Sequence, residues 1–224
     1  MDLDFWHQRW QANLIGFHQK TVNNHLLGCW PQLQLEEGSR ILVPLCGNSL
    51  DMMWLLEKGH PVVGIEVSQV AVESFFEENR LSPAVHEERY GRRYVVDQLE
   101  LLCADFFSLE PVDIGAVNAF YDRAALIALP PAQRPGYCAQ LKKLLGHNIS
   151  GLLVTLEYNQ AEMDGPPFSV PREEVCSLFD TAFTLKQLFQ FDALDENQKF
   201  RKKGVTQLTE LTYHLRSKQT SVEP

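Results

Sequence analysis

The sequence predicts an α/β fold in which helices cover both faces of a mostly parallel β-sheet. From Arg40 onward, short apolar runs alternate with amphipathic segments, and this alternation is typical of parallel strands joined by helices. Near the C-terminus, residues 183–191 and 205–215 alternate apolar and polar side chains instead. That pattern predicts a terminal antiparallel hairpin.

Each predicted strand is a short apolar run bounded by turn or cap residues. The first run, residues 41–45, ends at Cys46 and Gly47, and the next buried run covers residues 62–67. Between them a helix is expected to end at Gly59. The other predicted strands are 94–96, 99–103, 117–121 and 152–156, and the other predicted helices are 69–78, 130–145 and one beginning at Arg172; residues 164–171 are proline-rich and predict a loop.

Length and composition favour one globular domain. The chain has 224 residues, 45% hydrophobic and 22% charged, which lies within the range of ordinary folded domains. We expect a single domain, 1–224, with an N-terminal helical cover at 1–39 and the sheet core at 40–224. The aromatic residues of the cover either close a binding cleft or pack on the sheet edge, and both interpretations stay open here.

The overall charge argues against a nucleic-acid partner. A formal net charge of −9 opposes the counterion release that supplies most non-specific nucleic-acid affinity. One basic run, residues 199–203, is expected to be a solvated strand end or loop. No stretch approaches the length of a membrane span, so no membrane partner is expected. Since no apolar stripe requires a dimer, we expect a monomer.

The five cysteines are scattered, without the close pairs that build zinc or redox sites. No metal site is therefore expected, and the odd number argues against a disulfide framework. Asp2 and Asp4 stand where a secretory signal would carry positive charge. These features predict a protein of the reducing cytoplasm.

The ends of the first two strands suggest a nucleoside cofactor. Ligands of open α/β sheets bind outside the carboxyl ends of the strands. Gly47 follows the first strand, and Glu66 ends the second, 19 residues later. The spacing is near the ~20 residues expected for an acid that binds ribose hydroxyls. A single glycine is more often only a tight turn, and the pair does not specify which cofactor binds.

Two later strand ends carry further candidates. Asp105 could meet an adenine amino group while Phe106 packs on the ring, although Asp105 could equally cap a helix or turn. Asp122 and Arg123 close the strand at 117–121 and could face the reactive end of the cofactor. The same pair could instead form a surface ion pair of small energetic consequence.

Together, the segments FWHQRW (5–10), GFH (16–18), VPLCGNSLD (43–51), GIE (64–66) and YDRAAL (121–126) resemble the thiopurine S-methyltransferase family, in particular its bacterial branch. The resemblance implies a Rossmann-like domain with a seven-stranded sheet and a helical N-terminal cover. It also implies S-adenosylmethionine as cofactor and a small aromatic or heterocyclic thiol as acceptor, with selenium and tellurium compounds as further candidates.

The resemblance assigns roles to individual residues. By matched position, Trp10, Leu45, Glu66 and Arg123 would contact S-adenosylmethionine beside the Gly47 turn, Asp105 and Phe106 would lie along the adenine, and Phe17 would line the acceptor pocket. The match weakens after Pro166.

The implied reaction is in-line attack of a thiolate on the cofactor methyl carbon. Arg123 would favour the anion electrostatically, and Asp122 is the candidate for taking a proton from a less acidic thiol. Two alternatives stay open. A nicotinamide-dependent oxidoreductase also uses a glycine turn and a later acid, although the second and third fingerprint glycines are missing. A non-catalytic cofactor-binding protein of the same fold is the other.

Overall fold

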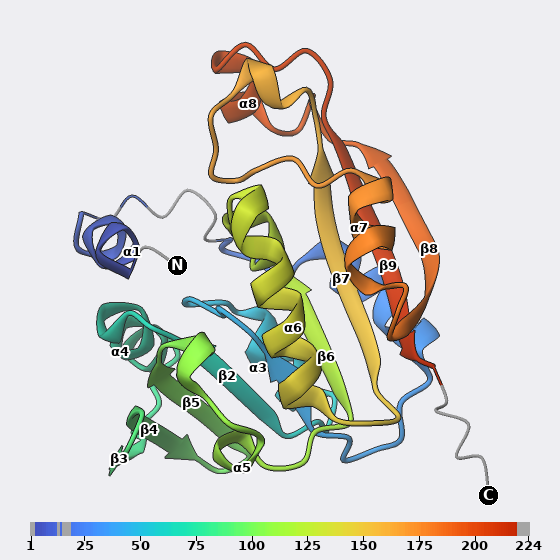
Figure 1. Cartoon of the computed structure of the whole chain (residues 1–224). Coiled ribbons are helices and arrows are strands. Elements are labelled where there is room, and N and C mark those ends of the chain that lie inside the picture. Colours follow the sequence, from blue (N-terminus) through green and yellow to red (C-terminus); the bar gives the residue numbers. More distant parts are fainter. Residues whose placement is uncertain (1–2, 13, 15–18, 219–224) are drawn as a thin grey trace, which may run out of the picture.

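The computed structural model describes residues 3–12, 14 and 19–218 and contains one β-sheet of nine strands (Figure 1). The strand order across the sheet is β3-β4-β5-β2-β1-β6-β7-β9-β8. The strands are β1 (Ile41–Val43), β2 (Val62–Glu66), β3 (Ala84–Glu88), β4 (Gly91–Val96), β5 (Leu99–Ala104), β6 (Ala119–Arg123), β7 (Ser150–Glu157), β8 (Phe183–Asp192) and β9 (Thr209–Ser217).

The middle of the sheet is parallel and its two edges are antiparallel. Strands β5, β2, β1, β6 and β7 pair in parallel, whereas β3 with β4 and β8 with β9 form hairpins. The mostly parallel core and the C-terminal hairpin are as predicted. The expected count of seven strands is too low, because β3 and β4 extend the sheet beyond β5. All five residues of β3 are exposed, so this strand has no apolar face that a sequence pattern could reveal.

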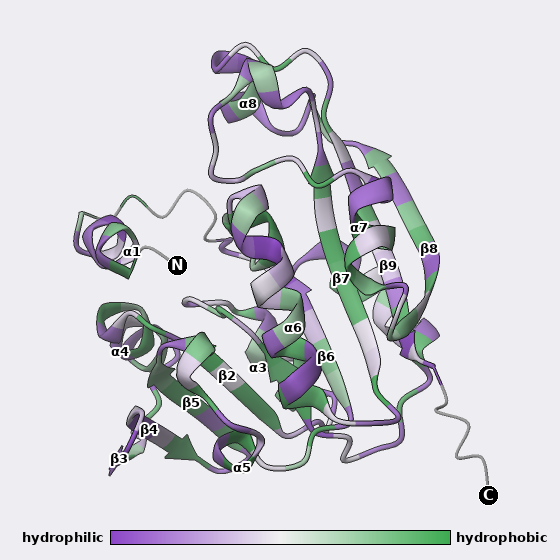
Figure 2. Ribbon diagram, in the orientation of Figure 1, coloured by the Kyte–Doolittle hydropathy of each residue, from purple (hydrophilic) through white to green (hydrophobic). Residues whose placement is uncertain are grey.

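Helices pack on both faces of the sheet, as predicted. Helices α5, α6 and α7 share a buried apolar cluster with one face, and α2, α3 and α4 share a second cluster with the other. Hydrophobic residues accordingly follow the central strands (Figure 2). The helices are α1 (Leu3–Gln11), α2 (Asn24–Cys29), α3 (Asp51–Glu57), α4 (Gln69–Glu78), α5 (Pro111–Ile114), α6 (Arg134–Leu145), α7 (Arg172–Phe179) and α8 (Gln198–Lys202). Of these described helices, none has the length and apolar character that crossing a membrane requires.

Strand order places a crevice at one edge of the sheet. Strand β1 lies between β2 and β6, and all three run in the same direction. The chain leaves β1 for β2 on one side and returns to β6 on the other, so β1 is the point where the strand order reverses. Loops that follow neighbouring strands diverge at such a point and leave room for a ligand.

Side chains of β6 alternate between the two helical layers. Tyr121 belongs to the cluster shared with α3, whereas Asp122 points to the opposite face, where the hydroxyl of Tyr137 on α6 donates to Asp122 Oδ2 at 2.7 Å. The amide of Leu126 donates to the other carboxylate oxygen at 3.2 Å. Asp122 is fully buried, and this burial raises its pKa to about 6 from 3.8, although the two hydrogen bonds oppose the shift.

The raised pKa of Asp122 predicts how stability changes with pH. The folded protein holds this proton more tightly than the unfolded chain, so the free energy of unfolding should fall as pH rises between about 4 and 6, by up to about 1.4 kcal/mol per pH unit. Asp122→Asn should remove this contribution, which urea unfolding at a series of pH values can measure.

The matched control is Asp164→Asn, at an exposed aspartate of the 164–171 loop. This variant should keep the wild-type slope. A wild-type slope in Asp122→Asn as well would show that the proton of Asp122 does not contribute to the pH dependence.

Candidate functional site

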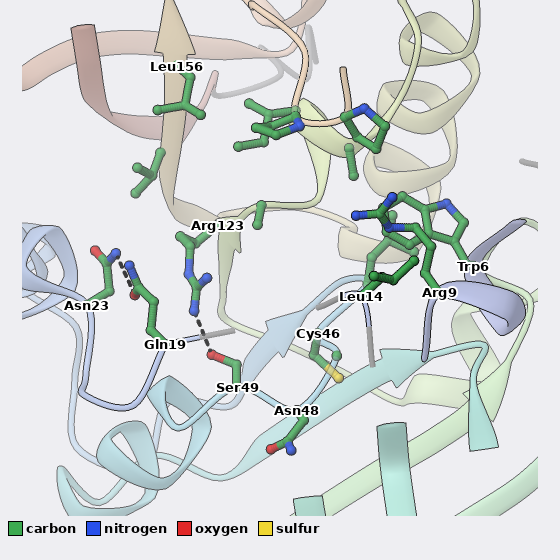
Figure 3. Close-up of a pocket in the computed structure, with 18 of the residues that line it drawn as sticks. Trp6, Arg9, Leu14, Gln19, Asn23, Cys46, Asn48, Ser49, Arg123 and Leu156 are labelled. Atoms are coloured by element: carbon green, nitrogen blue, oxygen red, sulfur yellow. Dashed lines mark hydrogen bonds between the residues drawn. The ribbon is translucent and has the colours of Figure 1, made fainter. Parts of the chain in front are cut away.

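A cavity of about 560 Å³ lies at the carboxyl end of the parallel strands. Its volume is within the range of small-molecule sites. Residues at the ends of β2, β6 and β7, in the segments that follow β1 and β6, and in α1 and α8 line it. Figure 3 shows Cys46 and Ser49 after β1, Arg123 of β6, Leu156 of β7 and Arg9 of α1. Of the predicted site residues, those that line this cavity are Trp10, Leu45, Gly47, Glu66 and Arg123.

Glu66 connects the turn after β1 with the end of β2. Its Oε2 accepts from the amide of Gly47 at 3.0 Å, and its Oε1 accepts from the amide of Ser68 at 2.7 Å. Burial raises the pKa of Glu66, and the backbone hydrogen bonds act in the opposite direction. The carboxylate is thus held in one orientation at the cavity, with further lone pairs that can accept hydrogen bonds from ligand hydroxyls.

Two non-glycine residues at the cavity have positive φ angles. Leu45 has φ +45° and Ala124 has φ +70°, in the left-handed region that side chains with a Cβ rarely adopt. Each follows a central parallel strand, β1 or β6, and each lines the cavity. Such conformations cost of order 1–3 kcal/mol each and cluster at functional sites. The surrounding packing therefore holds both turns in a shape that the isolated segments would avoid.

Asp51 at the start of α3 is the residue that orients Arg123. Its carboxylate is 1% exposed, and its Oδ2 accepts from Arg123 Nη2 at 3.2 Å and from the Tyr121 hydroxyl at 2.9 Å. The backbone amide of Asn23 donates to Oδ1 of Asp51 at 2.8 Å. Sequence reasoning missed this role, because an acid in the first turn of a helix is common and gives no sign of distant partners.

Arg123 lines the cavity, and two neighbouring residues hold its guanidinium in place. Besides its ion pair with Asp51, its Nη2 donates to Ser49 Oγ at 3.1 Å (Figure 3). The side chain is 12% exposed. Burial lowers its pKa, but the charge of Asp51 and the hydrogen-bonding neighbours Asp51 and Tyr121 together raise the pKa above the ordinary arginine value. Arg123 is thus a charged, oriented group at the cavity.

The N-terminal helix α1 contributes to the roof of the cavity. Trp6, Arg9 and Trp10 from this helix line it, and the Trp10 side chain is buried. In Figure 3, Trp6 and Arg9 lie on the side of the cavity opposite Leu156 of β7. This placement favours the interpretation of the N-terminal aromatics as a cover. Phe17 lies outside the described residues.

The basic run at 199–203 is mostly helical, which corrects the expectation of a strand end or loop, whereas its four basic side chains are exposed as expected. Its first four residues form most of helix α8, and Lys199, Phe200 and Lys203 line the cavity. The Phe200 ring packs against Tyr158, with ring centroids 5.7 Å apart. This contact is between residues 42 positions apart, so no local pattern in the sequence could indicate that the run faces a ligand site.

Asp105 and Phe106 are not brought to the cavity, contrary to the prediction. The Asp105 carboxylate accepts from the amide of Phe107 at 3.1 Å and so caps a short 3-10 helix. Phe106 is fully buried and stacks on Tyr137, with centroids 5.1 Å apart. The cap is thus confirmed for Asp105, and its contact with the adenine stays a prediction.

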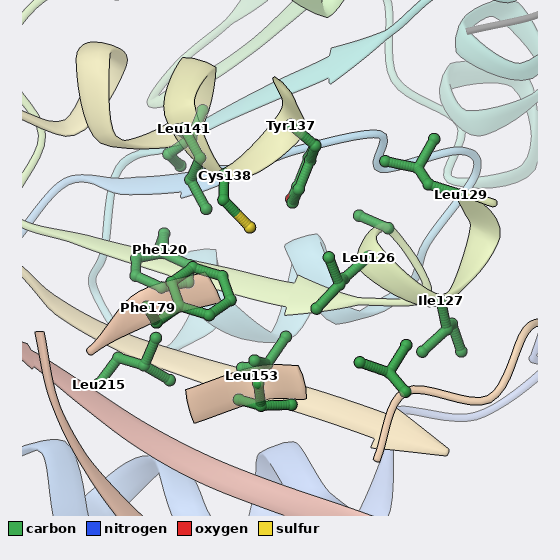
Figure 4. Close-up of a cluster of buried hydrophobic side chains, with 14 of the residues drawn as sticks. Phe120, Leu126, Ile127, Leu129, Tyr137, Cys138, Leu141, Leu153, Phe179 and Leu215 are labelled. Atoms are coloured by element: carbon green, nitrogen blue, oxygen red, sulfur yellow. The ribbon is translucent and has the colours of Figure 1, made fainter. Parts of the chain in front are cut away.

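Asp122 points to the α6 face of the sheet, away from the cavity, so it cannot take a proton there. Its partner Tyr137 belongs to the apolar cluster of the α6 face (Figure 4). Neighbouring residues of a strand point to opposite faces, so Arg123 and Asp122 cannot share one cleft. The expectation that Asp122 takes a proton from the acceptor is therefore wrong for this structure. Among the residues described, no group of three or more His, Cys, Asp or Glu could hold a metal ion.

Solved structures of distant sequence share the fold. An N-methyltransferase, NodS, from Bradyrhizobium japonicum in complex with S-adenosylhomocysteine superposes with a TM-score of 0.64 at 13% identity, covering 95% of this chain and 98% of the other. A 1,6-didemethyltoxoflavin-N1-methyltransferase from Burkholderia thailandensis gives a TM-score of 0.62 at 14% identity, covering 97% and 87%. At these identities the likeness establishes a Rossmann-like fold.

Sequence comparison is more specific. The family model described as thiopurine S-methyltransferase matches residues 1–218. A thiopurine S-methyltransferase from Pseudomonas fluorescens (strain Pf0-1) is 48% identical over 216 residues, covering 96% of this chain and 99% of the relative. One from Bordetella pertussis is 45% identical over 215 residues, covering 96% and 98%. By match length and identity, this chain belongs to the thiopurine S-methyltransferase family.

Proposed function

We propose that this protein transfers a methyl group from S-adenosylmethionine to the sulfur of a small aromatic or heterocyclic thiol. The observation that carries the proposal is that a fixed carboxylate, Glu66, and a fixed cation, Arg123, line the same cavity as the turn after β1. Family membership adds the reaction, since the curated relatives are named thiopurine S-methyltransferase.

The donor set fits a nucleoside cofactor. Glu66 would accept hydrogen bonds from the ribose hydroxyls, because its carboxylate is buried, held by two amides and open to the cavity. Trp10, Leu45 and Arg123 would hold the rest of the molecule, as the family resemblance implies. Asp105 is left out, because it does not line the cavity. S-adenosylmethionine supplies an activated methyl group on a positively charged sulfur.

The chain itself mainly positions the acceptor. Holding a nucleophile and its target in near-attack geometry lowers a barrier by up to roughly 7–11 kcal/mol in favourable cases. Arg123 would favour the anionic thiolate, since an opposite charge nearby stabilises the ionised form. Its ion pair with Asp51 fixes the guanidinium before any ligand binds.

Part of the cavity lining suits an aromatic ring. Apolar residues of the lining include Leu156, Met163, Pro166 and Phe200. An aromatic thiol would bury its ring on this surface and place its sulfur toward the charged residues of the cavity. Selenium and tellurium analogues of such thiols are proposed as further acceptors, because the same geometry would serve these larger and more polarisable nucleophiles.

Further proposals concern the oligomeric state, the compartment and the partners of the protein. We infer a single-domain monomer of the cytoplasm that acts on small molecules and does not bind nucleic acid. The five cysteines are unpaired, which suits a reducing compartment, and the net charge of −9 disfavours nucleic acid.

The first experiment separates the proposed function from its alternatives. S-adenosylmethionine should raise the midpoint of thermal unfolding, because a ligand that binds only the folded state stabilises it. Methyl transfer to a panel of aryl thiols, selenols and tellurium compounds should then be detectable. Protection by reduced nicotinamide dinucleotide alone would favour an oxidoreductase. Cofactor protection without transfer to any acceptor would favour a non-catalytic binding protein.

Glu66→Gln should weaken S-adenosylmethionine binding by roughly 10- to 100-fold, because hydrogen bonds to a charged acceptor contribute about 1.5–3 kcal/mol. Isothermal calorimetry measures the affinity directly. Glu73→Gln is the matched control, since Glu73 is an exposed residue of the neighbouring helix α4 and its substitution should leave affinity unchanged. An unaltered affinity in Glu66→Gln would remove Glu66 from the site.

Arg123→Met should lower the free energy of unfolding by about 3 kcal/mol, because it leaves the buried Asp51 carboxylate without its cation. Ser49→Ala removes the hydrogen bond from the same guanidinium and a longer one, at 3.3 Å, from the backbone amide of Asp51, and should cost about 1–2 kcal/mol. Urea unfolding of both variants gives the comparison. Similar, small losses in both would show that Asp51 does not depend on Arg123 for its charge balance.

A further inference from the structure

A second carboxylate at the cavity, Glu210 on β9, has no role in the function proposed above. Its Oε2 lies 2.5 Å from Nε2 of His25 on α2. The other ring nitrogen, Nδ1, lies 2.9 Å from the hydroxyl oxygen of Thr212, two residues along the same strand. Glu210, His25 and Thr212 therefore form a continuous hydrogen-bonded chain that ends at the cavity.

The chemistry of these groups determines the direction of the hydrogen bonds. An ionised carboxylate can only accept, so His25 must carry a hydrogen on Nε2 and donate it to Glu210. In the neutral imidazole, Nδ1 is then the acceptor, and the Thr212 hydroxyl donates to it. The hydroxyl thus selects the ring tautomer, and the ring in turn holds one oxygen of the carboxylate.

Burial decreases along the chain toward the cavity. Thr212 is fully buried and the His25 side chain is 7% exposed, whereas the Glu210 side chain is 24% exposed and lines the cavity. The carboxylate is therefore the group that a bound ligand can reach. The other two residues support it from inside the protein.

The register of the sheet places Glu210 near the proposed acceptor. Glu210 pairs with Leu156 of β7, and two residues earlier on β7 Val154 pairs with Arg123 of β6. Leu156, Val154 and Arg123 all line the cavity. Glu210 and Arg123 thus stand on opposite sides of one strand, at the same edge of the sheet.

We propose that Glu210 is the proton acceptor for thiols that are not already ionised, and that His25 is its positioning residue. The proposal rests on the proposed function. The acceptor S–H bond breaks and its proton passes to Glu210, while the sulfur electron pair forms the new bond to the methyl carbon. The donor carbon–sulfur bond breaks with its electrons on the donor sulfur, which becomes neutral, and Glu210 later releases the proton to water.

The test compares two thiols that each carry one benzene ring and differ in acidity. A nitro-substituted thiophenol is ionised at neutral pH, whereas benzyl thiol is mostly protonated. General base catalysis contributes about 10²–10⁴-fold, so Glu210→Gln should reduce kcat/KM for benzyl thiol by roughly 100-fold or more. For the ionised thiophenol the loss should stay within about threefold, because no proton has to be removed.

Glu157→Gln is the matched control, since Glu157 is a partly exposed glutamate at the end of β7 outside the cavity lining. It should leave both acceptors unaffected. His25→Leu should reproduce the selective loss, and His25→Gln, which retains an N–H donor, should restore part of it. Equal losses for both acceptors, or no loss for either, would overturn the proposal. Failure of the proposed function would differ, because the wild-type protein would then methylate neither thiol.

NMR, which requires no catalysis, tests the hydrogen-bonded arrangement of Glu210, His25 and Thr212. Nitrogen NMR of the wild-type protein should show His25 as the tautomer with hydrogen on Nε2, and Thr212→Val should weaken that preference. Wild-type protein with the hydrogen on Nδ1 would contradict the arrangement and with it the role of His25. A solvent deuterium isotope effect on the wild-type reaction with benzyl thiol, absent with the thiophenol, is expected and does not depend on the folding of any variant.

Discussion

The buried carboxylate of Asp51 is the contact on which the geometry of the site depends. It begins α3, and it binds the guanidinium of Arg123, the hydroxyl of Tyr121 and the amide of Asn23. These partners come from β6 and from the segment before α2, so one side chain joins the lining of the cavity to the N-terminal region. A buried charge of this kind is costly unless its partners are complete, and the fold therefore keeps all of these segments in place together.

The alternation of side chains along β6 separates the chemistry of the site from the core. Arg123 points to the face of α3 and the cavity, and its neighbour Asp122 points to Tyr137 and the opposite apolar cluster. A cation at the cavity and a carboxylate in the core thus come from adjacent residues. The acid at the acceptor end is then contributed by another strand, where Glu210 of β9 meets His25 of α2.

The sequence predicted the position of two cavity residues at the end of a local pattern, and their role in binding stays a prediction. Gly47 and Glu66 follow apolar strands, and parallel strands place their carboxyl ends at one edge, so their meeting at the cavity could be expected. Asp105 and Phe106 follow the same rule but end at a cap and in the core. Strand ends restrict where a residue lies, and the path of the backbone after the strand decides where the side chain points.

The sequence alone determined the α/β class, the parallel core, the C-terminal hairpin and the family, because periodicity and short motifs are properties of consecutive residues. Only the tertiary structure decided which polar groups meet. Asp51 lies 28 positions from Asn23, and His25 lies 185 positions from Glu210. The tertiary structure also decided that the basic run, residues 199–203, forms most of helix α8 and contributes to the lining of the cavity. Such pairs form because distant segments pack on the same sheet, and no local periodicity encodes which two segments will do so.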